Sequence, residues 1–161
     1  MRAIDVVYLY EHAARELDVA CAVTAILRQR GISTEILQWP TSLSQSVATI
    51  KPKVVALPFC YTERSFLPLF EYWSNAAFFN LTWEQLFYSG NLIAKTPRGK
   101  FALEHVIHHS WGDLYSNFLR TQGIPEGHIF TNGHPAYALY REPYRRFFPS
   151  RGELAQKYGL D

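Results

Sequence analysis

The sequence of 161 residues contains only two cysteines and one methionine, and only 19% of its residues are charged. Cys21 and Cys60 form neither a CxxC pair nor a Cys/His spacing typical of zinc ligands, so we expect both to be small buried residues in a reducing compartment. No apolar run is long enough to span a membrane, and Glu11 and His12 interrupt the apolar N-terminal stretch. These absences predict a cytoplasmic protein without a signal peptide, a disulfide framework or a metal centre.

Signatures of nucleotide binding, serine hydrolases and zinc proteases are also missing. The first expected strand is not followed by GxGxxG, and the sequence has no GxxxxGK[ST], GxSxG or HExxH motif. The net charge of +2 is too small for a face that binds duplex nucleic acid. The basic excess is concentrated near the end of the sequence, which would suit an anionic small molecule, a membrane surface contacted from the cytoplasmic side, or a solvated helix face; its residues are Arg141, Arg145, Arg146 and Arg151.

Apolar residues make up 48% of the chain and aromatic residues 16%, which predicts a globular domain with a sizeable core. Several aromatic residues stand in polar surroundings, where rings often line grooves, although a core rich in aromatic residues is the alternative; they are Tyr61, Trp73, Trp83, Tyr137 and Tyr140.

Strand-like and helix-like segments alternate along the chain. The expected strands are 4–10, 34–39, 53–59, 76–81, 105–110 and 128–132. The expected helices are 13–30, a short piece within 42–50, 64–75, 99–104, 113–122 and one or two within 141–159. This order predicts one Rossmann-like α/β domain over 1–161, with a doubly wound, mostly parallel sheet of about six strands and helices on both faces.

In such a sheet the ligand binds beyond the carboxyl ends of the strands, so the residues that follow each strand are the candidates for chemistry. We expect a binding site there that includes Glu11, His12, Tyr61, Trp83, His109 and His134. Glu84 is the best candidate for a general base, although a carboxylate that stabilises a helix N-terminus is the alternative. His108 and His109 are consecutive strand residues, so one should point inward and the other outward.

Several short pieces of the sequence resemble a family of bacterial surface carbohydrate biosynthesis proteins. These pieces are Asn80-Leu81-Thr82-Trp83-Glu84-Gln85, Ala94-Lys95-Thr96-Pro97, Trp111-Gly112, and Gly123-Ile124-Pro125 leading to 128–135. Members of this family resemble GT-B glycosyltransferases, in which a first Rossmann-like domain shapes the acceptor side and a second binds the nucleotide-sugar donor. The resemblance covers roughly 4–161 and implies that this chain is the acceptor-side domain.

The resemblance implies that the complete protein transfers a sugar from a nucleotide-activated donor to a glycan hydroxyl, as in capsule or O-antigen synthesis. It places Trp83 and Glu84 in the loop facing the cleft, Lys95 at a basic position and His134 at the domain junction. The donor is expected to bind the second domain, which this chain lacks, and no further cofactor or metal is expected. A nucleotide-sugar epimerase and a non-catalytic module that binds glycan or a partner remain alternatives.

Overall fold

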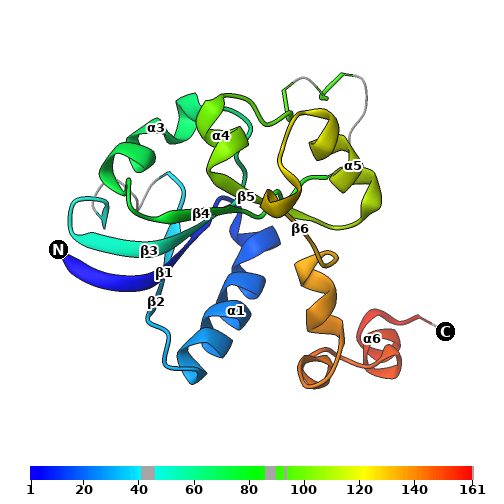
Figure 1. Cartoon of the computed structure of the whole chain (residues 1–161). Coiled ribbons are helices and arrows are strands. Elements are labelled where there is room, and N and C mark those ends of the chain that lie inside the picture. The colour runs from blue at the N-terminus through cyan, green and yellow to red at the C-terminus, as the bar shows by residue number, and fades with distance from the viewer. Residues whose placement is uncertain (41–45, 86–89, 93, 161) are drawn as a thin grey trace.

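A computed structural model describes residues 1–40, 46–85, 90–92 and 94–160, and these residues form one six-stranded sheet. The strands are β1 (Arg2–Tyr10), β2 (Thr34–Gln38), β3 (Ile50–Leu57), β4 (Ala77–Asn80), β5 (Val106–Ser110) and β6 (Ile129–Thr131). All neighbouring strands pair in parallel, in the order β2-β1-β3-β4-β5-β6 (Figure 1). The chain first winds from β1 to β2 and then in the opposite direction from β3 to β6. The predicted α/β fold with a parallel sheet is therefore confirmed.

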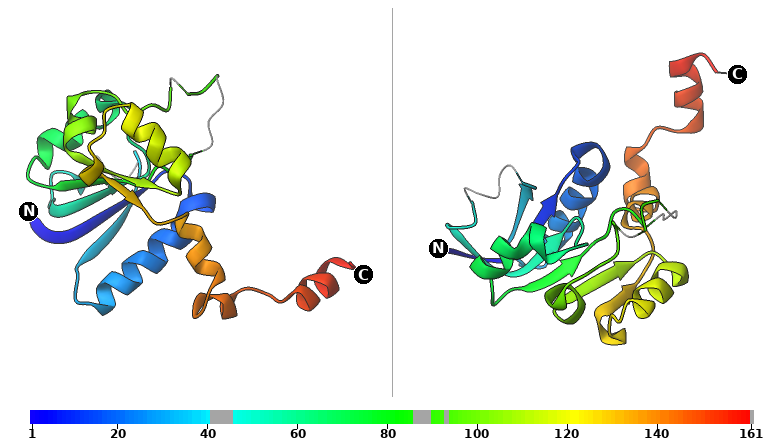
Figure 2. Two further views of the ribbon diagram at one scale, coloured as in Figure 1. Left: turned by 45° about the vertical axis from the view of Figure 1, so that its right-hand side comes forward. Right: turned by 90° about the horizontal axis from the view of Figure 1, so that it is seen from above.

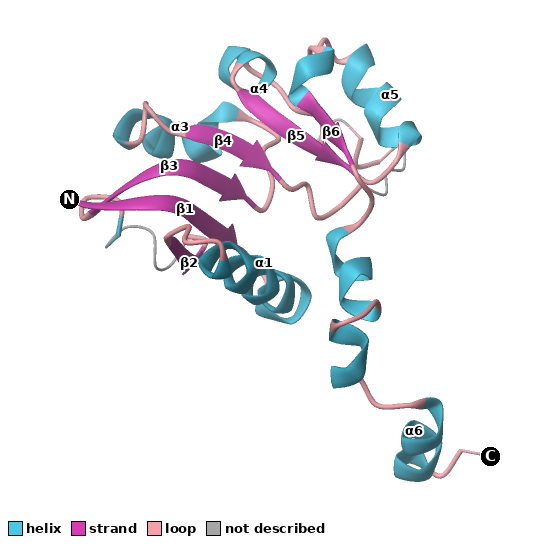
Figure 3. Cartoon of the chain, turned by 60° about the horizontal axis from the view of Figure 1, so that its bottom comes forward, coloured by secondary structure: helices cyan, strands magenta, loops and turns pink. Residues whose placement is uncertain are grey.

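Helices cover both faces of this sheet (Figure 3). The π-helical turn η1 (Ala13–Leu17) leads into α1 (Asp18–Gln29), which packs on one face against β1 and β2. The other face carries α3 (Glu63–Tyr72), α4 (Lys100–Glu104) and α5 (Asp113–Thr121) (Figures 1 and 3). No helix in the described part of the chain is both long and apolar enough to cross a membrane.

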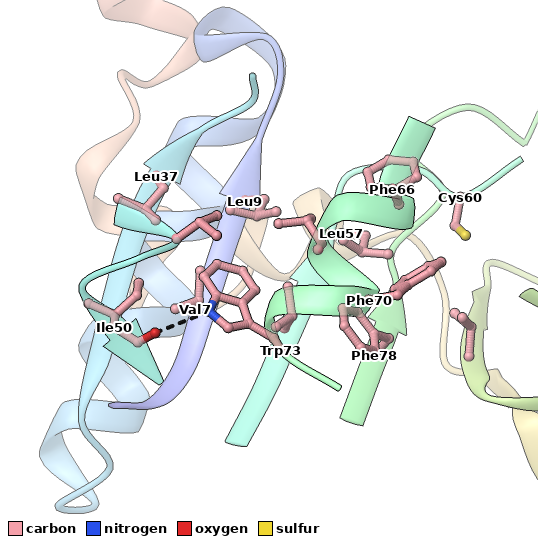
Figure 4. Close-up of a cluster of buried hydrophobic side chains, with 14 of the residues drawn as sticks. Val7, Leu9, Leu37, Ile50, Leu57, Cys60, Phe66, Phe70, Trp73 and Phe78 are labelled. Atoms are coloured by element: carbon pink, nitrogen blue, oxygen red, sulfur yellow. Dashed lines mark hydrogen bonds between the residues drawn. The ribbon is translucent and has the colours of Figure 1, made fainter. Parts of the chain in front are cut away.

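The main core fills the face beneath α3 and α4. Its residues include Val7 and Leu9 of β1, Val55 and Leu57 of β3, and Phe78 of β4 (Figure 4). These positions alternate along each strand, which is why the remaining strand residues face α1 and form a second, smaller core. Trp73 was expected to line a groove, but it is 3% exposed and its Nε1 donates to the Ile50 carbonyl at 3.1 Å (Figure 4). Burial with a satisfied indole makes it a core residue.

The segment after β6 extends away from the sheet (Figures 1 and 2). It contains the 3-10 helices η3 (Pro135–Tyr140) and η4 (Tyr144–Phe147), and ends in α6 (Arg151–Tyr158). A further 3-10 helix, η2 (Glu126–His128), precedes β6. The helix η3 lies outside the helices expected from the sequence. Ser150 and Glu153 form a capping box at the start of α6. Apolar side chains of this segment are exposed, among them Phe147 and Tyr158.

Three further expectations differ from the structure. The strand expected at 53–59 begins earlier, as β3 at Ile50, and the helix expected from residue 13 begins with the π-helical turn η1. Cys21 is exposed because it falls on the outer side of α1, whereas Cys60 is buried as expected. Of the short helix expected within 42–50, residues 42–45 lie outside those described, residues 47–49 form a turn, and Ile50 begins β3.

Candidate functional site

The carboxyl ends of β1, β3 and β4 enclose a pocket of about 220 Å³. We call it the switch-point pocket, because it lies where the chain reverses its winding direction between β1 and β3, which is where ligands bind in open α/β sheets. Its lining residues are Glu11, His12, Arg15, Pro58, Phe59, Tyr61, Trp83 and Glu84. Five of the residues predicted from sequence to bind ligand or catalyse therefore lie in a single pocket: Glu11, His12, Tyr61, Trp83 and Glu84.

Arg15 links the carboxylates around this pocket. Its Nε donates to Glu16 Oε1 at 2.9 Å, its Nη1 to Glu84 Oε1 at 2.8 Å, and its Nη2 lies 3.4 Å from Glu11 Oε2. The Glu16 side chain is fully buried, and its Oε2 accepts from the Glu11 backbone N–H at 2.7 Å. The turn η1 places Glu16 here, since the backbone N–H groups of Arg15 and Glu16 both donate to the His12 carbonyl. Arg15 and Glu16 thus brace the loop that follows β1.

Glu84 forms two ion pairs, one with Arg15 and one between its Oε2 and Lys95 Nζ. The Lys95 ammonium and, next, the Arg15 guanidinium hold the pKa of the Glu84 carboxyl below its usual range, against the opposing effect of partial burial. Lys95 is brought here because the Arg98 backbone N–H donates to the Tyr61 carbonyl at 2.7 Å. A carboxylate with a lowered pKa is a weaker base, so this arrangement favours a fixed anion over a proton acceptor.

A strained turn presents Trp83 and Glu84 to the pocket. Thr82, which is fully buried, has a φ of 44°, in the left-handed region that a β-branched residue rarely adopts. Its backbone N–H donates to Asn80 Oδ1 at 3.1 Å, and its carbonyl accepts from Gln85 Nε2 at 3.3 Å. Such a conformation costs about 1–3 kcal/mol and persists only where the surroundings enforce it. Asn80 and Gln85 provide that support.

His108 belongs to the same buried network. Its Nδ1 lies 3.0 Å from Asn80 Nδ2, and its Nε2 lies 2.8 Å from the Ala102 carbonyl. The amide of Asn80 donates to Nδ1, so Nε2 carries the proton and donates to Ala102, which describes a neutral imidazole. Burial lowers the pKa of His108 to about 4, which keeps the ring uncharged at neutral pH. His108 is a structural residue that holds Asn80 in place.

His109 does not line the switch-point pocket. Its ring interacts with the Leu81 carbonyl through Nδ1, at 3.2 Å, and with Asn132 Oδ1 through Nε2. The expectation that either His108 or His109 points outward is wrong. The two side chains face opposite sides of the sheet, but both are buried, with 0% of His108 and 2% of His109 exposed. On the face of the sheet toward which His109 points, an apolar groove of about 390 Å³ lies between α1 and the sheet, and His109 lines it.

His134 lies beside the pocket rather than in it. Its ring packs against Trp111 and Trp83, with ring centroids 4.1 Å and 5.6 Å away. Its Nδ1 accepts from the Ala136 backbone N–H at 3.0 Å, at the start of η3. Burial, followed by the nearby His109, lowers the pKa of His134 and favours the neutral ring. Through Trp83, His134 connects the pocket to the segment that follows β6.

Three aromatic side chains, those of Phe59, Tyr61 and Trp83, form part of the pocket wall. The half-buried ring of Tyr61 stacks on Phe59 with centroids 5.4 Å apart. Burial raises the pKa of the Tyr61 hydroxyl, and the neighbouring Glu84 carboxylate adds to this effect, so the hydroxyl stays protonated. Trp83 is 4% exposed, and its Nε1 donor has no partner among the described residues. The pocket therefore combines ring surfaces with carboxylate oxygens.

Sequence reasoning missed Arg15 and Glu16. Both were assigned to a helix that begins at residue 13 and were judged by its apolar face alone. The available signal was their position: they follow β1 within the same loop region as Glu11 and His12, at the edge where ligands bind. No group of three or more His, Cys, Asp or Glu side chains arranged to hold a metal occurs among the residues that the structure describes.

Comparisons of the chain with protein-family models, with curated protein sequences and with solved structures found no match.

Proposed function

We propose that this chain is the acceptor-side domain of a GT-B-like glycosyltransferase of surface polysaccharide synthesis, and that the switch-point pocket binds a sugar residue of the glycan acceptor. The observation that carries the proposal is the convergence of Glu11, His12, Tyr61, Trp83 and Glu84 on this pocket. Carboxylate oxygens accept hydrogen bonds from sugar hydroxyls, while the faces of aromatic rings pack against the apolar faces of a sugar ring.

The size of the pocket supports this assignment. Sites that enclose a drug-sized ligand usually measure about 300–1,000 Å³, and this pocket measures about 220 Å³. A single sugar ring at the end of a longer chain matches such a volume better than a complete nucleotide-sugar does. In the proposed protein the nucleotide-sugar donor binds a second domain. The exposed aromatic residues after β6, such as Tyr137 and Phe147, would suit contact with that domain.

A non-catalytic glycan-binding module is the second candidate, and the state of Glu84 favours it. A general base works best with a pKa near the working pH, whereas Lys95 and Arg15 lower the pKa of Glu84. In the transferase, Lys95 would have to release Glu84 before the carboxylate could take a proton from the acceptor hydroxyl. Replacing Glu84 with Gln in a longer protein that contains this sequence and transfers sugar separates the two: loss of turnover supports the base, and unchanged turnover removes it.

Ligand-observed NMR on the isolated chain tests the binding proposal directly. We expect oligosaccharides of surface polysaccharides to bind, and nucleotides not to bind. Tyr61→Ala should weaken saccharide binding by roughly three- to tenfold, because a stacked ring is removed. Tyr72→Ala is the matched control, since Tyr72 is an exposed tyrosine at the end of α3. Tight binding of a nucleotide-sugar without any glycan would contradict the proposal and favour the epimerase alternative.

The proposed reaction would take place at the cytoplasmic face of a membrane. The basic residues after η3 are exposed, as attraction to anionic lipid requires; they are Arg141, Arg145, Arg146 and Arg151. Sedimentation with anionic vesicles should carry the chain down at low salt and release it at high salt. If the chain stays in the supernatant at low salt, the membrane part of the proposal is lost, while the glycan-binding part stands.

A further inference from the structure

The charged groups of the switch-point pocket do not balance. Three carboxylates, those of Glu11, Glu16 and Glu84, are joined by Arg15, and Lys95 adds the second permanent cation among the described residues of this network. Three anions against two cations leave one formal negative charge in this network, histidines not counted. A site of this sign attracts cations and repels phosphates and sugar acids.

The unmatched charge is located on Glu11. The Glu16 carboxylate is fully buried and accepts from Arg15 and from the Glu11 backbone, and each oxygen of Glu84 accepts from a cation. The Glu11 carboxylate has weaker partners: its Oε2 lies 3.4 Å from both Arg15 Nη2 and His12 Nε2, and its side chain is 33% exposed. Glu11 is thus the pocket carboxylate with the most capacity left to bind a ligand.

The aromatic side chains of the pocket independently favour a cationic ligand. Trp83 and Tyr61 both line the pocket, and the half-buried ring of Tyr61 stacks on Phe59 with centroids 5.4 Å apart. The electron-rich faces of such rings attract a cationic group.

We infer that the switch-point pocket selects a sugar ring bearing a protonated amino group and that Glu11 accepts from the ammonium. This inference rests on the proposed function and makes it more specific, because it names the charge of the acceptor sugar and the residue that determines it. Glu11 is a specificity residue of the pocket, whereas Arg15 and Glu16 position the loop that carries it.

Three sugars that differ in charge test this inference by NMR titration at neutral pH: glucosamine, N-acetylglucosamine and glucuronic acid. We expect glucosamine to bind about fivefold more tightly than N-acetylglucosamine, as one partly exposed ion pair allows, and glucuronic acid to bind most weakly. Glu11→Gln should bring the ratio between the first two sugars close to one. Glu71→Gln, which changes an exposed glutamate on α3, should leave the ratio unchanged.

The outcomes separate the inference from the proposed function. If glucuronic acid binds as tightly as glucosamine, or if Glu11→Gln keeps the preference for glucosamine, the charge selection is refuted while glycan binding stands. If none of the sugars and no oligosaccharide binds, the proposed function fails and the inference fails with it. Amide spectra of each variant, compared with those of the wild type, show whether a change in binding comes from loss of the fold.

Discussion

Replacing Arg15 with Met tests the pairing that holds the site together. The change leaves the carboxylate of Glu16 buried without its cation. Removing one partner of a buried ion pair typically costs about 3–5 kcal/mol. Because the Arg15 side chain is 33% exposed and water reaches it, we expect the lower end, about 3 kcal/mol of unfolding free energy. For a domain of this length that corresponds to a fall in Tm of about 6–12 °C.

Urea denaturation followed by tryptophan fluorescence measures this loss. In the double variant with Glu16→Gln, no charge is left buried, so the two changes together should cost less than their sum by at least about 1 kcal/mol. Arg64→Met, which alters an exposed arginine of α3, is the control and should change stability little. If Arg15→Met costs less than about 1 kcal/mol, or if the two changes are additive, Arg15 does not stabilise Glu16 and the described network is wrong.

Three further predictions concern buried and terminal groups. The pKa of His108 is about 4 in the folded protein against 6.5 in the unfolded chain, so the unfolded state binds more protons between these values. The free energy of unfolding should therefore fall as the pH drops from about 6.5 to about 4. In His108→Gln, the urea midpoint should fall less over this pH range. Asn80→Ala should cost about 2 kcal/mol and change the emission of Trp83, because Thr82 loses its acceptor. Ser150→Ala should lower helicity over 151–158 in NMR shifts without changing the urea midpoint, since α6 stands apart from the sheet.

The fold could be predicted because its signals are local and repeated. The strand β1 contains the apolar run 6–10, and Gly31 and Gly123 mark the ends of helices with positive φ. Parallel strands then place the residues after β1, β3 and β4 at one edge. That geometric rule groups Glu11, Tyr61 and Glu84 from the sequence alone.

The features that were missed depend on contacts between distant segments. The partners of Glu84 come from η1 and from the segment of Lys95, eleven residues later in the chain, and no local pattern encodes that meeting. The same holds for Thr82, whose strained φ is set by Asn80 and Gln85 and not by its own preference. Period-two alternation placed His108 and His109 on opposite faces, but it does not say whether a face is covered.

The two candidate functions differ in what Lys95 does. The segment that carries it is tied to the strand edge, because the Arg98 backbone N–H donates to the Tyr61 carbonyl and Thr62 pairs with Arg98. Release of Glu84 therefore requires either a new side-chain rotamer of Lys95 or a shift of a segment bonded next to the pocket wall. A bound ligand that takes over the Lys95 ammonium would raise the pKa of Glu84 toward the range of a working base. Glycan binding alone needs no such change, so under the proposed function Lys95, and not Glu84 itself, would determine whether the pocket only binds a sugar or also activates its hydroxyl.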